Sequence, residues 1–307
     1  MDPLKKLDLA WDTSLHLARE LHGRGHKTFL FEPESLSLES GKVTGRGQLI
    51  QPLVRHRYHL EPSQKKNLAE FDTVFIRKDP PFNSGYLSLT YLLEPLAEQT
   101  CVINHPKGLR DANEKLFGLS FSRWLAPTLV SADTQEILAF QNKIRCDLVI
   151  KPLYEKGGKG VFRLKRGEVP EKLNKATRGG FDWVIAQKFI PVPKGRGDKR
   201  ILLWKGEILG AFERIPPPGD FRSNLSLGGK FIKCSVTPSE KKLVQNLRSA
   251  FSEKGLFFVG IDVREGFLIE INVTSPAGLV ELDQLYGGAS ARMASDLERP
   301  KKFVTAG

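Results

Sequence analysis

The stretch Phe258–Pro276, FVGIDVREGFLIEINVTSP, constrains this chain more than any other part of its sequence. Two apolar runs flank the tight turn Arg264-Glu265-Gly266 and predict a β-hairpin. Strand side chains alternate between two faces, so Asp262, Glu270 and Asn272 share a face if the loop holds an odd number of residues, such as three with its glycine in the left-handed region. Two carboxylates and an amide oxygen on one face suit Mg²⁺ with bound phosphates. The alternative is an ordinary half-buried hairpin whose polar residues face solvent.

A glycine-rich loop lies upstream, in DLVIKPLYEKGGKGVFRLK (residues 147–165). Leu148–Ile150 predicts a buried strand with Lys151 at its end, and Gly157 and Gly158 interrupt the chain before a second strand at Val161–Leu164. Because a strand and not a helix follows, the loop is neither a Walker A motif nor a dinucleotide fingerprint. Glycine lets backbone N–H groups approach phosphates closely, and Lys151 would add a positive charge. The alternative is a plain hairpin turn.

Two other segments could contact a nucleotide. Asn113–Leu116 opens a helical stretch that offers a second lysine, Lys115. The run WVIAQKFI (residues 183–190) predicts an apolar strand whose backbone could bond an adenine edge as a hinge does.

A long hairpin, Ile201–Arg214, is predicted with its turn at Lys205-Gly206 and follows the sequence Gly197-Asp198-Lys199-Arg200. Arg200 and Arg214 fall at its two ends, where planar guanidinium groups suit phosphate or carboxylate recognition. For either arginine alone, a surface ion pair is the alternative.

The first third of the sequence alternates between helical and strand patterns. Helices are predicted at Ser14–Leu21 and Leu87–Leu96, and strands at Lys27–Phe31, Thr73–Arg77 and Cys101–Asn104. This order is typical of a βαβ-type domain with a mainly parallel sheet. A later amphipathic helix is predicted at Ser239–Gly255.

Composition narrows the class of protein. With 307 residues, 40% of them hydrophobic and 27% charged, the chain is expected to be soluble and to hold two or three modest domains. It has no apolar run long enough for a membrane span and no signal peptide, and its three cysteines lie far apart, so we expect a cytoplasmic protein without a membrane partner. The net charge of +12 attracts polyanions, but the basic residues are dispersed and no nucleic-acid module is recognisable. Anionic small substrates explain part of this charge, and we expect no nucleic-acid partner.

The segments described above follow one another in a fixed order. A lysine on a helix comes first, then a strand lysine with its glycine loop, a hinge strand, the Asp-Lys-Arg hairpin and the Asp…Glu-x-Asn hairpin. This order resembles that of the ATP-grasp fold. Within that fold, nearly the whole chain resembles bacterial glutathione synthetase. The resemblance lies, in the family's order and spacing, in RKDPPF (77–82), LRDANEKLF (109–117), GDKR (197–200), ERIP (213–216), RSNLSLGG (222–229), EKGLFFVGIDV (253–263) and EINVTSP (270–276).

The resemblance implies an α/β (α+β) ATP-grasp fold preceded by the βαβ-type N-terminal domain. It implies three parts: an N-terminal substrate domain (residues 1–112), a central ATP-grasp lid subdomain (113–190) and a C-terminal catalytic ATP-grasp subdomain (191–307). The family carries an apolar strand before its Met-Asp-Pro, so either this sequence starts late or the first sheet lacks a strand. The family also has Asp-Gly-Met where this sequence has Tyr154-Glu155-Lys156 before the glycine pair.

The implied reaction is the ATP-dependent joining of γ-glutamylcysteine to glycine through an acyl phosphate, with Mg²⁺ or Mn²⁺ as cofactor and a homo-oligomer as the assembly. The implied catalytic residues are Arg200 and Arg214, and the implied metal ligands are Asp262, Glu270 and Asn272. The residues implied to bind ATP are Lys115, Lys151, Gly157, Gly158, Gln187, Lys188, Phe189 and Asp198. Those implied to face the peptide and amino-acid substrates are Arg77, Arg222, Asn224, Ser275 and Pro276.

Two alternative functions remain open. One is a related ATP-grasp ligase with a different acyl donor or amine acceptor, and Ala277 and Gly278 lie where the acceptor would be selected. The other is a nucleotide-binding relative without turnover.

Overall fold

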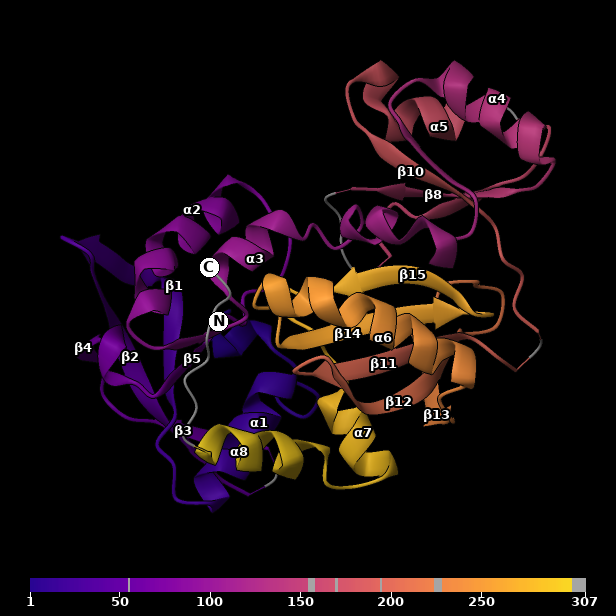
Figure 1. The fold of residues 1–307 in the computed structure, drawn as a ribbon. Helices are drawn as coiled ribbons and strands as arrows, with labels where there is room; N and C mark the ends of the chain where they lie inside the picture. Colours follow the sequence, from indigo (N-terminus) through magenta and orange to yellow (C-terminus); the bar gives the residue numbers. More distant parts are fainter. Residues whose placement is uncertain (55, 154–157, 169–170, 194, 224–227, 300–307) are drawn as a thin grey trace.

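The computed structural model of the chain describes residues 1–54, 56–153, 158–168, 171–193, 195–223 and 228–299. Figure 1 shows an N-terminal part rich in long strands, a small sheet carrying α4 and α5, and a larger sheet carrying α6.

The N-terminal strands are mainly antiparallel. β1 (Phe29–Glu39) and β2 (Lys42–Pro52) form a hairpin, and β3 (Tyr58–Leu60) and β4 (Gln64–Asn67) both pair antiparallel with β2. Among the strands of this part that the structure describes, only β5 (Thr73–Phe75) and β6 (Cys101–Ile103) are parallel. The prediction of a mainly parallel N-terminal sheet is therefore wrong.

The turn between β1 and β2 explains the difference. Ser40 and Gly41 are its two central residues, with φ of 49° and 77°, and Glu39 pairs directly with Lys42. A two-residue turn with positive φ at both positions matches the twist of an antiparallel pair. The turn directs β2 back along β1. β1 itself extends to Glu39, well beyond the predicted end of the strand at Phe31.

The helices of this part begin with side-chain caps. α1 (Thr13–Gly23) starts after Asp12, whose carboxylate accepts from the Leu15 N–H, and α2 (Ser84–Leu93) starts after Asn83 in the same way. The other helical segments are α3 (Pro106–Asp111) and the short 3₁₀ turns η1 (Leu4–Lys6), η2 (Leu68–Glu70) and η3 (Glu94–Glu98).

A cavity of about 940 Å³ lies between β1, β5 and α1. Its wall is mainly apolar and includes two continuous stretches of chain, residues 26–31 and 72–78. Within the described chain β5 pairs only with β6. The Met1 amine lies at the cavity, donates to the Phe31 carbonyl at 2.7 Å, and has its pKa lowered to about 6 by burial.

The second sheet has the strand order β7-β10-β8-β9. Its strands are β7 (Thr128–Ser131), β8 (Leu148–Pro152), β9 (Phe162–Leu164) and β10 (Val184–Lys188). β8 pairs antiparallel with β9, which confirms the predicted strand–loop–strand order around the glycine loop. The helical segments of this region are η4 (Phe117–Trp124), α4 (Thr134–Ile144), α5 (Glu171–Ala176) and η5 (Arg178–Gly180), and Ile137 and Leu173 pack on the sheet.

The third sheet is antiparallel throughout, in the order β13-β12-β11-β14-β15. Its strands are β11 (Asp198–Trp204), β12 (Glu207–Ile215), β13 (Lys230–Lys233), β14 (Phe258–Arg264) and β15 (Phe267–Asn272). The β11–β12 turn at Lys205-Gly206 has positive φ at both residues, which confirms the predicted hairpin.

The two faces of this sheet pack against different helices, because side chains alternate along each strand. Ile201, Leu203 and Ile261 pack with Leu243 and Leu247 of α6 (Pro238–Glu253). Figure 1 shows α6 lying across this sheet. The opposite face buries a second cluster that includes α7 (Leu279–Leu285) and α8 (Ala289–Glu298); its members include Leu202, Trp204, Phe212, Leu282 and Met293. Among the described residues, no helix is long and apolar enough to cross a membrane.

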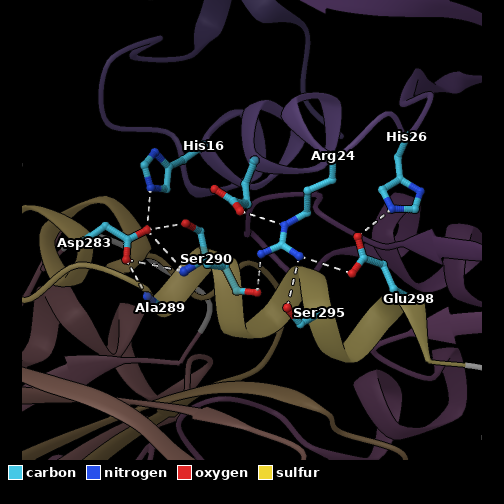
Figure 2. A network of polar contacts seen from close by, with 10 residues as sticks. His16, Arg24, His26, Asp283, Ala289, Ser290, Ser295 and Glu298 are labelled. Carbon is cyan, nitrogen blue, oxygen red and sulfur yellow. Dashed lines mark hydrogen bonds and ion pairs between the residues drawn. The ribbon is translucent and has the colours of Figure 1, made fainter.

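The last helices return to the first one. Figure 2 shows Asp283 between His16 of α1 and Ser290 of α8, with 2.8 Å from His16 Nε2 to Asp283 Oδ2. Arg24 donates to Ser295 Oγ and Glu298 Oε2 at 3.1 and 3.2 Å. Polar contacts thus join the start of the chain to its last helix.

Candidate functional site

The predicted metal hairpin has a different turn from the one expected. Arg264 pairs with Phe267, so the loop contains two residues, Glu265 and Gly266, with φ of 47° and 80°. The odd residue lies in a bulge instead, because Asp262 pairs with Glu270 while Val263 pairs with Leu268. The bulge restores the alternation, and Asp262 and Glu270 are direct cross-strand neighbours on one face.

Asp262 is held by two arginines from neighbouring strands. Arg200 donates from Nε and Nη2 to the two Asp262 oxygens at 2.6 and 3.0 Å, and Arg214 Nη2 lies 2.9 Å from Oδ1. Burial alone would raise the pKa of Asp262, but the two guanidinium charges outweigh it and lower this pKa to about 2. The predicted arginines and one predicted metal ligand therefore form one buried network.

Glu270 has a different environment. Its carboxylate lies 4.0 Å from Lys115 Nζ, and burial raises its pKa while the Lys115 charge opposes that effect. Asn272 directs its amide nitrogen to the Gly260 carbonyl at 3.2 Å and to Asp262 Oδ2 at 3.4 Å. A divalent cation would relieve the burial of the Glu270 charge, and carboxylate and amide oxygens suit Mg²⁺, so the residues present fit this metal.

Lys151 joins the second sheet to the third. Its ammonium donates to Gln187 Oε1 at 2.8 Å and to the carbonyl of Ile269, the bulge residue, at 3.4 Å. Burial lowers the pKa of Lys151 to about 8. The same boundary encloses a cavity of about 10 Å³ lined by Lys115, Lys151, Gln187 and Glu270, so three predicted nucleotide residues and one predicted metal ligand lie together there.

The predicted hinge has its N–H groups already bonded. Lys188 N–H donates to the Pro127 carbonyl and Phe189 N–H to the Asp147 carbonyl, each at 2.8 Å. An adenine would therefore depend on other groups of this strand.

The predicted residue Asp198 pairs with Arg264, and its N–H donates to Ser223 Oγ at 3.1 Å. Lys199, one residue on, points to the opposite face and binds Glu240 of α6 at 2.7 Å. Asp198, Arg200 and Arg214 therefore share one face of the sheet, and Lys199 does not.

The predicted substrate residues Ser275 and Pro276 lie on the turn after β15, and Arg77 bonds to it. Arg77 Nη2 donates to the Pro276 carbonyl at 2.9 Å, and Arg200 Nη1 to the Ala277 carbonyl at 2.9 Å. Ser275, which precedes Pro276, lies on the same turn.

Arg222 lies apart from this turn. It pairs with Asp220 and donates to the Gly158 carbonyl at 3.1 Å. Gly157, Asn224 and the segment Tyr154-Glu155-Lys156 lie outside the described residues.

Comparison with known protein families identifies the family of this chain. The family model for the prokaryotic glutathione synthetase ATP-grasp domain matches residues 114–287, and that for the N-terminal domain of the same enzymes matches residues 1–110. The chain belongs to the prokaryotic glutathione synthetase family.

Relatives in this family align with nearly the whole chain. Glutathione synthetase of Rhodopseudomonas palustris is 36% identical over 312 residues, covering 98% of this chain and 97% of the relative. That of Prochlorococcus marinus is 41% identical over 295 residues, covering 93% and 92%. The chain is therefore similar to these enzymes along their length.

Solved structures show the same ATP-grasp fold at low identity. An ATP-grasp ligase, PsnB, complexed with a phosphomimetic precursor variant, Mg and ADP matches with a TM-score of 0.63 at 16% identity, covering 93% of this chain and 94% of that one. The macrocyclase MdnC of Microcystis aeruginosa, bound with its precursor peptide, matches with a TM-score of 0.62 at 20% identity, covering 94% and 96%. At these identities the likeness concerns the fold alone.

Sequence reasoning missed two acidic residues of the site. Glu114 Oε1 accepts from the N–H groups of Val273 and Thr274 at 2.8 and 2.9 Å and from the Thr274 hydroxyl at 2.8 Å, so it fixes the turn after β15. Glu281, in the first turn of α7, is 6% exposed. Glu114 lies in a glutathione synthetase motif next to Lys115, a signal that could have found it, whereas Glu281 has no local signal.

Proposed function

We propose that this chain catalyses the reaction of its family, joining γ-glutamylcysteine to glycine with consumption of ATP. The γ-phosphate would pass to the cysteinyl carboxylate, giving an acyl phosphate and ADP. The glycine amine would then attack the acyl carbon, and phosphate would leave. The observation that carries the proposal is the match of both family models over nearly the whole chain.

The residues at the boundary of the two sheets support nucleotide binding. Lys115 and Lys151 would hold phosphates, together with Gly157 and Gly158, and the strand residues Gln187, Lys188 and Phe189 would frame adenine. Asp198 would support this site through its pair with Arg264. Lys151 keeps a buried ammonium within reach of the bulge on β15, where phosphate charge would gather.

Glu270, Asn272 and Asp262 would hold Mg²⁺ or Mn²⁺. When bound, the metal ion would neutralise phosphate charge. Arg200 and Arg214 already lie at fixed positions through Asp262, so they would stabilise the phosphoryl and acyl-phosphate oxygens without reorganising. Arg77, Arg222, Asn224, Ser275 and Pro276 would face the dipeptide and glycine.

We further propose the division of the chain into residues 1–112, 113–190 and 191–307. A cytoplasmic homo-oligomer that uses small substrates, without nucleic acid or membrane, is proposed on the same basis of family membership.

The test is ADP release by the purified chain with ATP, Mg²⁺, γ-glutamylcysteine and a panel of amines. Turnover with glycine as the best acceptor is expected. Turnover only with another acyl donor or amine would indicate the related ligase. Nucleotide binding without ADP release for any pair would contradict the proposal and indicate a relative without turnover.

A further inference from the structure

Glu281 is a buried carboxylate without a full set of partners. Only 6% of its surface is exposed, and its Oε2 has no hydrogen-bond partner among the described residues. A carboxylate oxygen buried without a donor is costly, so such atoms usually gain a partner in the working protein. The missing partner must be a hydrogen-bond donor.

The charges around Glu281 come from three elements. Burial raises the pKa of Glu281, while the Glu281 backbone N–H and, after it, Arg200 of β11, Arg214 of β12 and His16 of α1 favour its charged form. Arg200 and Arg214 share Asp262 as their ion-pair partner, and Arg214 Nε has no partner in the described part of the chain. Glu281 lies in the first turn of α7, a few residues after the Ala277 carbonyl that accepts from Arg200, and it experiences the charge of both arginines proposed to bind the acyl phosphate.

The backbone fixes Glu281 relative to those arginines. α7 follows the turn whose Ala277 carbonyl accepts from Arg200, and Gly278 bonds to Thr13 Oγ1 at 3.2 Å. A Cβ on Gly278 would lie 2.8 Å from Phe212, so this close approach requires glycine. α7 cannot shift away from the sheet without breaking these contacts.

We infer that Glu281 binds the ammonium group of the incoming amine and accepts its proton. The inference rests on the proposed function and adds a residue to it. An amino-acid amine is largely protonated at neutral pH and cannot attack in that form. Transfer of one proton to the Glu281 carboxylate frees the nitrogen lone pair, which forms the C–N bond as the C–O bond to phosphate breaks. The second nitrogen proton leaves with the departing phosphate.

The test compares two nucleophiles in the full-length Glu281→Gln variant. Glycine needs deprotonation, whereas hydroxylamine is a much weaker base, is already neutral at pH 7, and traps acyl phosphates as hydroxamates. We expect glycine-dependent product formation to fall roughly 100-fold, as for loss of a general base. Hydroxamate formation should stay within about two-fold, and the remaining glycine rate should rise about ten-fold per pH unit as free amine accumulates.

Asp283→Asn is the matched control, because Asp283 lies on the same helix but contacts His16 and Ser290. Comparable loss with glycine and hydroxylamine in Glu281→Gln would overturn the inference and assign Glu281 to positioning the arginines. Unchanged glycine turnover in Glu281→Gln would also overturn the inference. So would an Asp283→Asn variant that lost activity with glycine but kept activity with hydroxylamine. Failure of the unaltered chain to form hydroxamate would instead contradict the proposed function.

Discussion

At the scale of single residues, the candidate site separates its two carboxylates by their surroundings. Asp262 has two guanidinium partners and a lowered pKa, whereas Glu270 has a lysine at 4.0 Å and a raised pKa. The two residues are cross-strand neighbours, so a one-residue change in register would have placed them on opposite faces. Their opposite pKa shifts follow from the charges nearby, which are arginines of β11 and β12 at Asp262 and Lys115, in the turn before η4, at Glu270.

Glu270→Gln is expected to lower kcat at saturating Mg²⁺ by about 100-fold or more, a cost of roughly 3 kcal/mol in transition-state stabilisation. The change removes the carboxylate that is not already bonded to arginine. Steady-state ADP release measures it, with Glu265→Gln in the neighbouring turn as the control. A variant that retained more than half of the original kcat would contradict the metal assignment.

Arg200→Lys is expected to lower kcat/KM about as strongly as Glu270→Gln lowers kcat. Arg200 donates in three directions, to both Asp262 oxygens and to the Ala277 carbonyl, and an ammonium cannot reproduce that planar geometry. Arg178→Lys, at an exposed pair with Asp182, is the control. Near-normal kcat/KM for Arg200→Lys would show that the planar guanidinium group of Arg200 is not needed.

Asp262 should contribute to acid stability. Because its folded pKa is depressed to about 2, its contribution is present above the unfolded carboxyl pKa of about 4 and is lost as pH falls towards 2. Between pH 4 and pH 2 the free energy of unfolding in urea should therefore fall by on the order of 2 kcal/mol more for the unaltered chain than for Asp262→Asn. Parallel pH profiles for the two proteins would exclude this role.

At the scale of elements, helix and strand patterns predicted more than turns did. The two-residue turns and the bulge at Ile269 depend on backbone conformations that hydrophobic periodicity does not encode. Ser40-Gly41 is a possible turn signal, but Pro33 and the irregular register between Phe31 and Leu36 interrupt the strand pattern, so the sequence predicts this strand only as far as Phe31. The face carrying Asp198, Arg200 and Arg214 could be predicted from alternation and family motifs, but the pairing of Asp198 with Arg264 and the burial of Glu281 could be seen only in the tertiary structure.

The start of α6 gives a prediction at this scale. Thr237 Oγ1 accepts from the Glu240 N–H at 3.2 Å, and Glu240 Oε2 accepts from the Thr237 N–H at 2.7 Å. Thr237→Ala should lower the free energy of unfolding by about 1 kcal/mol, because one helix N–H loses its acceptor. Chemical denaturation measures the change against Ser239→Ala on the exposed first turn, and equal stability of the two variants would contradict it.

At the scale of the whole molecule, α1 and α8 hold the first and last parts of the described chain together (Figure 2). Arg24→Ala should lower the midpoint of thermal unfolding at low ionic strength, and 1 M salt should reduce the difference because the contacts are partly exposed. A double-mutant cycle with Glu298→Gln isolates the contribution of the pair. Zero coupling at low salt would show that packing alone joins the helices.

The same junction bears on how the chain is made. α1 is synthesised well before the residues that cover one of its faces, from Asp283 to Glu298. Domains can fold during synthesis from the N-terminal end. Here α1 gains these neighbours only after residues 283–298 have been synthesised, so a nascent chain ending before α7 should leave α1 accessible to protease, while a chain that includes α8 protects it.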